Sequence, residues 1–338
     1  MEQLAGASAP AAGTFHEATQ AGSVIHGRHV IGLTVWVCLL LLACARDAAP
    51  AGVRPAPATV PPGAQATPVV EGAAARVVAV GDVHGDPAAL LRVLQLAGVV
   101  DAGGAWSGGT ATLVQTGDIT DRGPDSKGVM ATLRRLQAEA VAAGGQVVPL
   151  LGNHEVMNMQ GDLRYVNPLD TEAYGGDAPR AAAFGREGDD GAWLRSLDAV
   201  AQVQDTIFCH GGVTPRWAEL GVRQLNVLVR EGIDQPPASG PAKAAGSADV
   251  LGPDGPLWFR GYLVEEEPVA CAELERALAS LGAARMVVGH TTQESGQVAS
   301  RCGGKLYAID VGISAHYGNH DGYVEIVAGQ PRVRGSER

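Results

Sequence analysis

The sequence predicts a layered α/β domain, and three observations support that prediction. Short apolar runs with the character of strands alternate with longer segments whose apolar residues repeat at helical spacing. Polar motifs that contain glycine follow several of these runs, as is typical where strands end at the edge of an open sheet. The chain has 338 residues, of which 46% are hydrophobic and only 18% are charged, so it can bury a full core. Alternation alone predicts a single open sheet with helices on its faces.

The predicted elements follow one another from residue 76. Each strand is a short apolar run, and the helices show apolar residues at helical spacing, as in the series Leu90, Val93, Leu94 and Ala97. In order, they are a strand at 76–80, a helix within 86–100, a strand at 110–116, a helix from Asp125 or Ser126 to Gly144, and strands at 146–151, 205–209, 284–288 and 305–310. Pro149 is unexpected in the strand at 146–151, because proline has no N–H group for a central position in a sheet.

The residues before this domain are predicted to be a targeting segment and a linker. Val30–Ala43 carries no charge and is shorter than the ~20 residues of a membrane span, so it is typical of the apolar part of a signal peptide. It ends in LLAC, which resembles a bacterial lipobox and would leave a lipid-modified Cys44 at the new N-terminus. A signal cleaved nearby and an uncleaved anchor are the alternatives. Ala45 fits sorting to the outer membrane of a Gram-negative host, so we expect an exported lipoprotein on the periplasmic side of that membrane or at the cell surface.

The domain organisation follows from these assignments. We expect a signal peptide at 1–44, an Ala/Pro-rich linker at 45–75, one folded catalytic domain at 76–330 and a tail at 331–338. The formal net charge of -11 argues against nucleic acid and anionic lipid as partners, because both require a basic surface. Contact with a membrane is therefore expected only through the N-terminal lipid or anchor.

The histidines of the domain are placed in one consistent way. Nine histidines occur in the chain, and the four between residues 30 and 315 are His84, His154, His210 and His290. Each follows an apolar run and has glycine within two residues, in GDVHG, GNHE, CHGG and VVGHT. Because glycine allows tight turns at strand ends, these side chains are predicted to converge on one crevice.

A fifth motif of the same kind, GDITDRG, follows the second predicted strand. It supplies Asp118, Asp121 and Arg122. Mixed Asp, Asn and His ligands suit divalent Mn, Fe or Zn, and two such ions need a bridging carboxylate, for which Asp118 is the candidate. Arg122 offers a forked cation for phosphate oxygens. His154, oriented by Asp121, is the candidate acid that protonates a leaving group.

The five motifs, in this order and spacing, resemble those of the calcineurin-like metallophosphoesterases. The stretches LLGNHEVMNMQGDLRYV, LWFRGY, RMVVGHT and IDVGIS are similar to the Shewanella-like protein phosphatase group of the phosphoprotein phosphatase branch, over residues 76–328. The resemblance implies a central mixed β-sandwich flanked by helices, with a dimetal site at the strand ends. It also implies the two metal-ligand sets, which are Asp82, His84 and Asp118 for one ion and Asp118, Asn153, His210 and His290 for the other.

The same resemblance implies the remaining roles. Asp121 and His154 match the acid pair, Arg122 matches a phosphate-binding arginine, and Arg260 in LWFRGY matches a second one at a position where the spacing varies. Residues 314–322, SAHYGNHDG, depart from the toxin-contacting loop of the eukaryotic relatives, so we expect insensitivity to those toxins. The segment from Asp170 to Asp190 receives no role.

Two cysteines of the domain have an open pairing. If the domain is exported, oxidising conditions favour a disulfide between Cys271 and Cys302, but two free thiols remain the alternative because sequence does not set their geometry. Cys209 is expected to be a buried small hydrophobic residue.

These residues lead to one preferred function and two alternatives. We expect a monomeric dimetal phosphomonoesterase that removes phosphate from Tyr, Ser or Thr of proteins by attack of a hydroxide held between the metals, with Mn as the first candidate and Fe or Zn as others. The same chemistry on small molecules, including a hydrolase of diadenosine tetraphosphate, is the first alternative. A catalytically inactive binding module is the second.

Overall fold

The computed structural model describes residues 76–235 and 249–335. Its helices are α1 (Pro87–Leu96), α2 (Ser126–Ala142), α3 (Asn153–Met159), α4 (Pro168–Ala173), α5 (Asp177–Phe184), α6 (Asp189–Ser196), α7 (Pro215–Ala218), α8 (Gly221–Ile233), α9 (Gly261–Val264), α10 (Glu267–Leu281), and the 3-10 turns η2 (Cys302–Gly304) and η3 (Ala315–Tyr317). Its strands are β1 (Val77–Val80), β2 (Thr112–Gln115), β3 (Gln146–Pro149), β4 (Val200–Val203), β5 (Thr206–Cys209), β6 (Arg285–Val288), β7 (Ala299–Arg301), β8 (Leu306–Ala308), β9 (Gly322–Val327) and β10 (Gln330–Gly335).

The expected signal peptide at 1–44, with Cys44, and the linker at 45–75 lie outside the described residues. Within 76–235 and 249–335, no helix is both long enough and apolar enough to cross a membrane.

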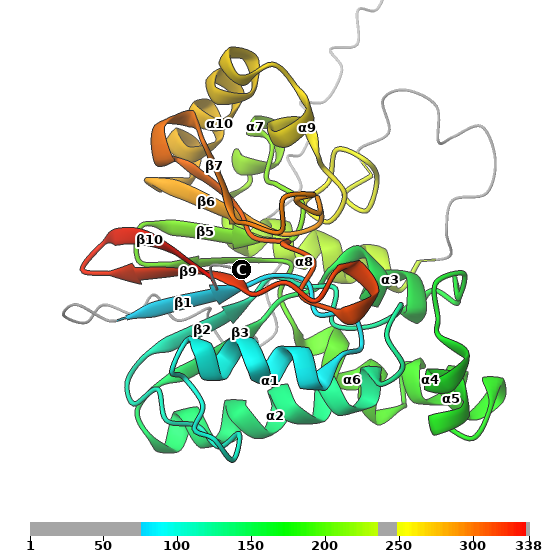
Figure 1. The fold of residues 1–338 in the computed structure, drawn as a ribbon. Helices are drawn as coiled ribbons and strands as arrows, with labels where there is room; N and C mark the ends of the chain where they lie inside the picture. Colours follow the sequence, from blue (N-terminus) through cyan, green and yellow to red (C-terminus); the bar gives the residue numbers. More distant parts are fainter. Residues whose placement is uncertain (1–75, 236–248, 336–338) are drawn as a thin grey trace, which may run out of the picture. The chain divides into compact units, whose positions relative to one another are not determined.

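The strands form two five-stranded mixed sheets (Figure 1). The first has the order β10-β9-β1-β2-β3, in which β1, β2 and β3 are parallel and β9 and β10 are antiparallel to their neighbours. The second has the order β4-β5-β6-β8-β7, with a parallel centre of β5, β6 and β8 and an antiparallel strand at each edge. The parallel strands of each sheet end in the histidine and aspartate motifs.

The two sheets bury a common apolar core. Val77 and Ala79 of β1 and Val324 of β9 belong to the same cluster of buried side chains as Phe208 of β5 and Val287 of β6. Alternate side chains of a strand point to opposite faces, so the other set packs against helices. In Figure 1, α1 and α2 lie beside the first sheet and α10 lies beside the second. The fold is therefore a mixed β-sandwich flanked by helices, and the single open sheet that alternation alone suggests is wrong.

The two long N-terminal helices begin where the sequence predicts. Asp86 caps α1 by accepting a hydrogen bond from the backbone N–H of Ala89 at 2.9 Å, and Pro87 occupies the first turn, where its missing N–H costs nothing. Asp125 caps α2 in the same way through the N–H of Gly128 at 2.7 Å. Both helices direct their apolar stripe at the sheet, with Leu90 and Leu133 fully buried.

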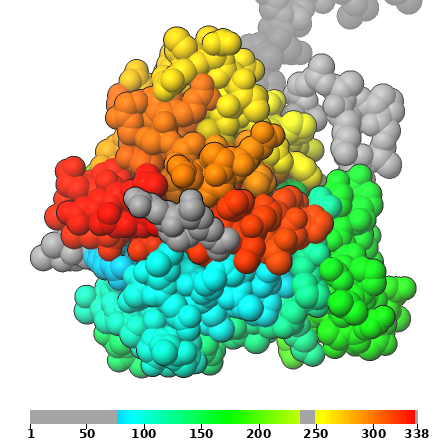
Figure 2. Space-filling model, in the orientation of Figure 1, coloured from blue at the N-terminus to red at the C-terminus, as the bar shows by residue number. Residues whose placement is uncertain are grey.

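Strand pairing at the edges of the sheets was not fully predicted. The strands β4, β7, β9 and β10 were not expected, and β10 continues to Gly335, so the tail expected from residue 331 begins inside a strand that pairs with β9. In the space-filling view these C-terminal residues (red) lie between the N-terminal layer (cyan) and the later part of the second sheet (orange) (Figure 2). Pro149 is accommodated because β3 is an edge strand.

A disulfide joins Cys271 of α10 to Cys302 of η2. It ties the helix that covers the second sheet to the turn between β7 and β8. Cys209 is free and buried, and burial raises the pKa of its thiol to about 12, as expected for an inert core residue.

Candidate dimetal site

The strand-end motifs converge on the carboxylate of Asp118, which follows β2. Asp118 Oδ2 lies 3.2 Å from Nε2 of His210, 3.5 Å from Nε2 of His84 and 3.9 Å from Nε2 of His154. These side chains are all buried, although His210 and His84 lie in the loops after β5 and β1 and His154 lies in the first turn of α3, after β3. The central position expected for Asp118 therefore matches its place among the three rings.

Two of these rings present lone pairs to the same space. His210 Nδ1 lies 2.9 Å from the carbonyl oxygen of Thr116, and His84 Nδ1 lies 3.1 Å from that of Thr120. A carbonyl oxygen only accepts, so each Nδ1 carries the proton, and in the neutral ring each Nε2 is left with a lone pair. Such a backbone partner is the usual way in which a ligating histidine is oriented.

The convergence of acceptors indicates a cation site. His210 Nε2 lies 3.0 Å from Oδ1 of Asn153 as well as 3.2 Å from Asp118, so three electron-rich atoms face one another with no proton to share when the ring is neutral. The Asn153 amide is oriented by its Nδ2, which lies 3.8 Å from the sulfur of Met157. Oxygen and imidazole donors of this kind fit a divalent ion of the Mn, Fe or Zn type.

His290 completes the second ligand set. Its ligand atom lies within 4.8 Å of those of Asp118 and His210, and its buried Nε2 has no hydrogen-bond partner in the described part of the chain. An unpartnered buried nitrogen is costly unless a ligand satisfies it. The residues present therefore fit a metal at this position.

Two groups of side chains bring their ligand atoms close together, namely His84, Asp118 and His154, and Asp118, His210 and His290. Asp82 belongs to neither group but lies beside them. Its two carboxylate oxygens lie 3.3 and 3.1 Å from the backbone N–H of His290, which donates to them. Burial, followed by the nearby Asp310 and Asp118 carboxylates, raises the pKa of Asp82 well above its usual value. Three acidic groups so close together are stabilised by positive charge, which agrees with the ligand role expected for Asp82.

Charge states divide the histidines into two kinds. Burial lowers the pKa of His84 to about 4 and that of His290 to about 2, so both rings are neutral and available as ligands. Burial also favours the neutral form of His154, but Asp118 and Asp121 outweigh it and raise its pKa. For Asp118, burial is opposed by His210, His154 and His84, which hold the pKa of this carboxyl well below its usual range.

His154 has the surroundings of an acid. Its Nδ1 lies 2.7 Å from Oδ2 of Asp121, a side chain that is wholly buried, while its Nε2 faces the site. His154 also lies close enough to His84 and Asp118 to form a group of potential ligands. Its raised pKa and its bond to Asp121 favour the acid role over metal ligation.

The backbone around the site is unusually strained. Positive φ angles occur at five predicted site residues, namely His84 (41°), Asp118 (53°), Asp121 (69°), Arg122 (65°) and His290 (64°). Each such residue costs on the order of 1–3 kcal/mol, which the surrounding structure must offset. Strain of this kind concentrates where side-chain direction matters more than local stability.

Glycines of the motifs leave room for the ligand carboxylates. A Cβ at Gly152 would collide with the carboxylate of Asp118, and one at Gly289 would collide with that of Asp82. These two glycines precede Asn153 and His290. Gly152 thus brings its segment against a carboxylate after the neighbouring strand β2, and Gly289 brings its loop against a carboxylate after β1 of the other sheet. Any residue with a Cβ in place of the glycine in GNHE or VVGHT would therefore collide with a ligand carboxylate.

Glu155 is a functional residue whose role sequence reasoning missed. Its wholly buried carboxylate accepts hydrogen bonds from the backbone N–H groups of Gly152, Asp118, Ile119 and Thr120 at 2.8–2.9 Å, and from the Thr120 hydroxyl at 2.8 Å. It therefore fastens the loop that carries Asp118 to the start of α3. The sequence signal was a charged residue directly after the GNH triplet at the N-terminus of a helix, where a carboxylate is favourable.

The guanidinium of Arg122 is held in place and, in the described part of the chain, has an unpartnered donor that can bind an anion. Its guanidinium lies 3.9 Å from the centre of the Tyr165 ring, and its backbone N–H donates to the carbonyl of Tyr165 at 2.9 Å. The Nε of Arg122 is buried without a hydrogen-bond partner within the described residues. Stacking restricts the fork while leaving its N–H groups free for phosphate oxygens.

Arg260 lies at the rim of the second ligand set. Its Nη1 donates to the carbonyl of His290 at 2.7 Å and to the Thr291 hydroxyl at 3.2 Å, and the side chain is exposed. The structure thus brings Arg260 beside the site, although its guanidinium is partly engaged by the backbone. Its expected contact with phosphate stays a prediction.

Residues 314–322, the loop that is expected to depart from its eukaryotic counterparts, border the site on the side of His84. The Tyr317 ring lies 4.9 Å from that of His84, and the Tyr165 ring lies 5.1 Å from that of His154. Asp86 fastens this loop by accepting from the N–H of Ala315 at 2.9 Å. The second aspartate of the GDVHGD stretch therefore both caps a helix and anchors the Tyr317 loop.

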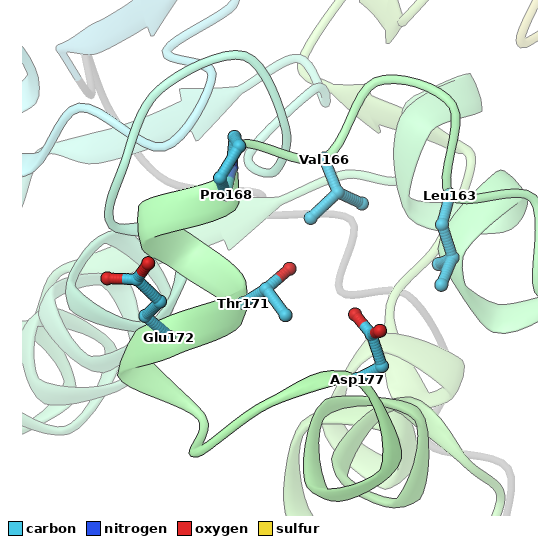
Figure 3. Close-up of a pocket in the computed structure, with 6 residues that line it drawn as sticks. All are labelled: Leu163, Val166, Pro168, Thr171, Glu172 and Asp177. Atoms are coloured by element: carbon cyan, nitrogen blue, oxygen red, sulfur yellow. The ribbon is translucent and has the colours of Figure 1, made fainter.

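A groove of about 410 Å³ lies against the loop that carries Tyr165 (Figure 3). The side chains of Thr171 on α4 and Asp177 at the start of α5 project toward Leu163 and Val166 of the loop. The same two helices include part of the segment from Asp170 to Asp190, to which the sequence assigned no role. They carry the buried side chains of Asp170 and Arg180.

Comparison with known proteins places this site in a family. A family model of the calcineurin-like phosphoesterases matches residues 75–294, which is more than half of the chain. The chain belongs to this family. The dimetal centre of the family corresponds to the clusters around Asp118, so this protein is a metal-dependent phosphoesterase.

Individual relatives of this phosphoesterase are consistent with that assignment. It is 38% identical to an uncharacterized protein of Schizosaccharomyces pombe, over 71% of this chain and 74% of that one. It is 32% identical to Shewanella-like protein phosphatase 2 of Arabidopsis thaliana, over 75% and 74% of the two chains. The crystal structure of a cold-active protein-tyrosine phosphatase from a psychrophilic Shewanella superposes with a TM-score of 0.68 at 31% identity, covering 80% of this chain and 83% of that one.

Proposed function

We propose that this phosphoesterase is a protein phosphatase that prefers phosphotyrosine. The proposal rests above all on the arrangement of Arg122, His154 and Tyr165, which join an anion-binding fork, a proton donor and an aromatic surface within one small space. It is supported by the relatives that are named protein phosphatases and by the solved structure named a protein-tyrosine phosphatase.

Each residue has a separate task in the proposed reaction. Two divalent ions, held by His84, Asp118, Asn153, His210, His290 and the adjacent Asp82, would activate a water and neutralise phosphate oxygens. Arg122 binds and orients the phosphate through its fork. Water attacks phosphorus, the ester P–O bond breaks, and His154 Nε2 gives its proton to the departing oxygen while Asp121 stabilises the ring in position.

The preference for an aryl ester follows from the two tyrosines. The Tyr165 ring borders both Arg122 and His154, so it lies where the leaving group departs, and the Tyr317 ring borders His84 on another side of the cluster. Aromatic pairs contribute about 0.5–1.5 kcal/mol beyond area burial, which amounts to several-fold in selectivity. We propose manganese as the resident ion, with iron or zinc as alternatives, because oxygen and imidazole donors suit all three.

The experiment compares four substrates on the purified full-length protein with Mn²⁺. Phosphate release is measured from matched peptides carrying phosphotyrosine, phosphoserine or phosphothreonine, and from diadenosine tetraphosphate. We expect the highest kcat/KM on phosphotyrosine, and a several-fold fall in this preference in Tyr165→Leu. Equal rates on the three peptides would remove the aryl preference while leaving a protein phosphatase.

A nucleotide hydrolase is the competing outcome of that experiment. Over 46% of its length the chain is 31% identical to a symmetrical bis(5'-nucleosyl)-tetraphosphatase of Shewanella oneidensis. Activity confined to diadenosine tetraphosphate would therefore replace the proposed function with this one, and no release from any substrate would favour a binding module.

We also propose that the protein is exported as a lipoprotein anchored at Cys44. The Cys271–Cys302 disulfide supports this, because structural disulfides persist mainly in oxidising compartments. Labelling with a radioactive fatty acid in a bacterial host should mark the wild type and not Cys44→Ala. Equal labelling of both, or of neither, would contradict the anchor.

A further inference from the structure

A closed ring of buried hydrogen bonds lies behind the Asp121–His154 pair. Asp121 uses Oδ2 for His154, and its other oxygen, Oδ1, accepts from Nδ2 of Asn158 at 2.8 Å. Asn158 Oδ1 in turn accepts from Nη1 of Arg180 at 2.7 Å. Asn158 lies one turn after His154 on α3, so the amide bridges the acid pair and a more distant cation.

The ring closes through the start of α2. Arg180 Nε donates to Oδ2 of Asp170 at 3.0 Å, and Asp170 Oδ1 accepts from the backbone N–H of Ser126 at 2.8 Å. The Ser126 hydroxyl accepts a hydrogen bond from the backbone N–H of Asp121 at 3.2 Å, so the series of hydrogen bonds ends at the residue where it began. The remaining terminal nitrogen of Arg180, Nη2, makes no hydrogen bond to the described residues and lies 3.8 Å from Oδ1 of Asp121.

Arg180 is a buried cation whose partners lie inside the protein. Its side chain is 1% exposed, and its guanidinium packs 4.4 Å from the centre of the Phe184 ring. Taking a charge out of water is expensive, and good geometry with carboxylates on both sides only offsets that cost, so a buried ion pair is a poor device for stability alone. Two of its three nitrogens bond to groups that fix the direction of Asp121 or the start of α2.

We propose that Arg180 is a positioning residue for the acid of the reaction, acting through Asn158 to hold the Asp121 carboxylate in the orientation that aims His154 at the leaving group. The inference rests on the proposed role of His154. Because a planar fork bonds Asn158 and Asp170 at once and an ammonium group is a single point, lysine is not an equivalent substitute. The segment from Asp170 to Asp190 thereby acquires a function.

The test measures the rate of the full-length protein against the leaving group. A series of simple phosphate esters, from p-nitrophenyl phosphate through phenyl phosphate to an alkyl phosphate, is hydrolysed by wild type and Arg180→Lys with Mn²⁺. We expect kcat on the alkyl ester to fall about tenfold, with KM changed less than about twofold and p-nitrophenyl phosphate nearly unaffected, because only poor leaving groups need the proton. The Asn158→Leu variant, which removes both bonds of the bridge, should show the same pattern if Arg180→Lys fails to fold.

Tyr174→Phe is the matched control. It removes a hydrogen bond of 2.7 Å to Asp190 in the same helical segment, and neither residue contacts Asp121 through a hydrogen bond. We expect this variant to lower thermal stability without changing the dependence of rate on leaving group. A purely structural role for Arg180 would give the same result as the control.

A double-mutant cycle separates positioning from stability. In the Asp121→Asn background, Arg180→Lys should cause no further loss on alkyl esters, because the group that it positions is already impaired. Equal loss on all esters by Arg180→Lys, or full additivity with Asp121→Asn, would overturn the proposal. Failure of the proposed function is distinguishable, since it would appear as wild type that hydrolyses simple esters but no phosphopeptide.

Discussion

His154 and Asp121 form a buried pair in which Nδ1 of the ring lies 2.7 Å from Oδ2 of the carboxylate. The side chain of His154 is 7% exposed and that of Asp121 is wholly buried. Asp121 lies in the loop after β2, and His154 lies in the first turn of α3, which follows β3. The pair leaves one ring nitrogen directed toward Asp118, at 3.9 Å. Proton donation at that nitrogen is the role that we propose for the side chains of this pair.

His154→Asn should separate esters by their leaving groups. Asparagine keeps a polar side chain, but its amide N–H is too weak an acid to transfer a proton. Hydrolysis of an alkyl phosphate should therefore fall by about 10²–10⁴, the usual contribution of a general acid. Loss on p-nitrophenyl phosphate should be less than about tenfold, and metal content by elemental analysis should be unchanged. An equal loss on both esters would argue against His154 as the acid.

Asp118→Asn should act on metal binding itself. The carboxylate lies within 3.5 Å of Nε2 of both His84 and His210, and its removal deprives both ligand sets of their shared charge. We expect the purified variant to contain less than half the metal of wild type, as measured by elemental analysis. Asp177→Asn, an exposed carboxylate at the edge of the groove, should keep full metal content. Unchanged metal in Asp118→Asn would refute the bridging assignment.

Glu155→Gln should destabilise the protein although Glu155 is not a predicted ligand. The carboxylate accepts from four backbone N–H groups and one hydroxyl, and burial followed by the nearby Asp118 raises its pKa. The amide turns one acceptor into a donor facing donors, which should cost at least about 3 kcal/mol of unfolding free energy in urea denaturation.

Glu172→Gln is the control for that experiment. Glu172 is exposed on α4, and its loss of charge should shift the unfolding free energy by less than about 0.5 kcal/mol. If the Glu155 and Glu172 variants were equally stable, the fastening role of Glu155 would be wrong.

Loss of the disulfide should lower the free energy of unfolding by an amount that depends on the length of the loop it closes. Cys271 and Cys302 are 31 residues apart, for which the loop-entropy relation gives about 3–4 kcal/mol. Urea unfolding of the Cys271→Ser, Cys302→Ser double variant against oxidised wild type measures the difference. Intact mass after alkylation without reduction provides the check, and two alkylated thiols at these positions would exclude the bridge.

The convergence of the site could be predicted because its signals are local. A glycine, a short polar motif and a preceding apolar run mark each strand end, and parallel strands of one sheet end on the same side. His84 and Asp118 accordingly lie together after strands of the first sheet, and His210 and His290 after strands of the second. The packing of the two sheets then joins the two pairs around Asp118. The starts of α1 and α2 were equally accessible, since Asp86 and Asp125 cap these helices from directly before their first turns.

What the sequence did not predict depends on partners far along the chain. β10 contains QPRVRG, a largely exposed polar stretch that becomes a strand only because β9 pairs with it, and β9 pairs with β1 almost 250 residues earlier. Arg180 resembles an ordinary surface arginine until the fold surrounds it with Asp170 and Asn158. The second sheet, too, follows from packing rather than from alternation.

Titration of activity with Mn²⁺ after complete chelation is the most direct test of a two-metal site around Asp118. Phosphate release from a phosphotyrosine peptide by the full-length protein is followed against equivalents of metal bound per chain. We expect no activity in the metal-free protein and full recovery only as the second ion binds. Activity that survives chelation, or that recovers without bound metal, would contradict a two-metal site around Asp118.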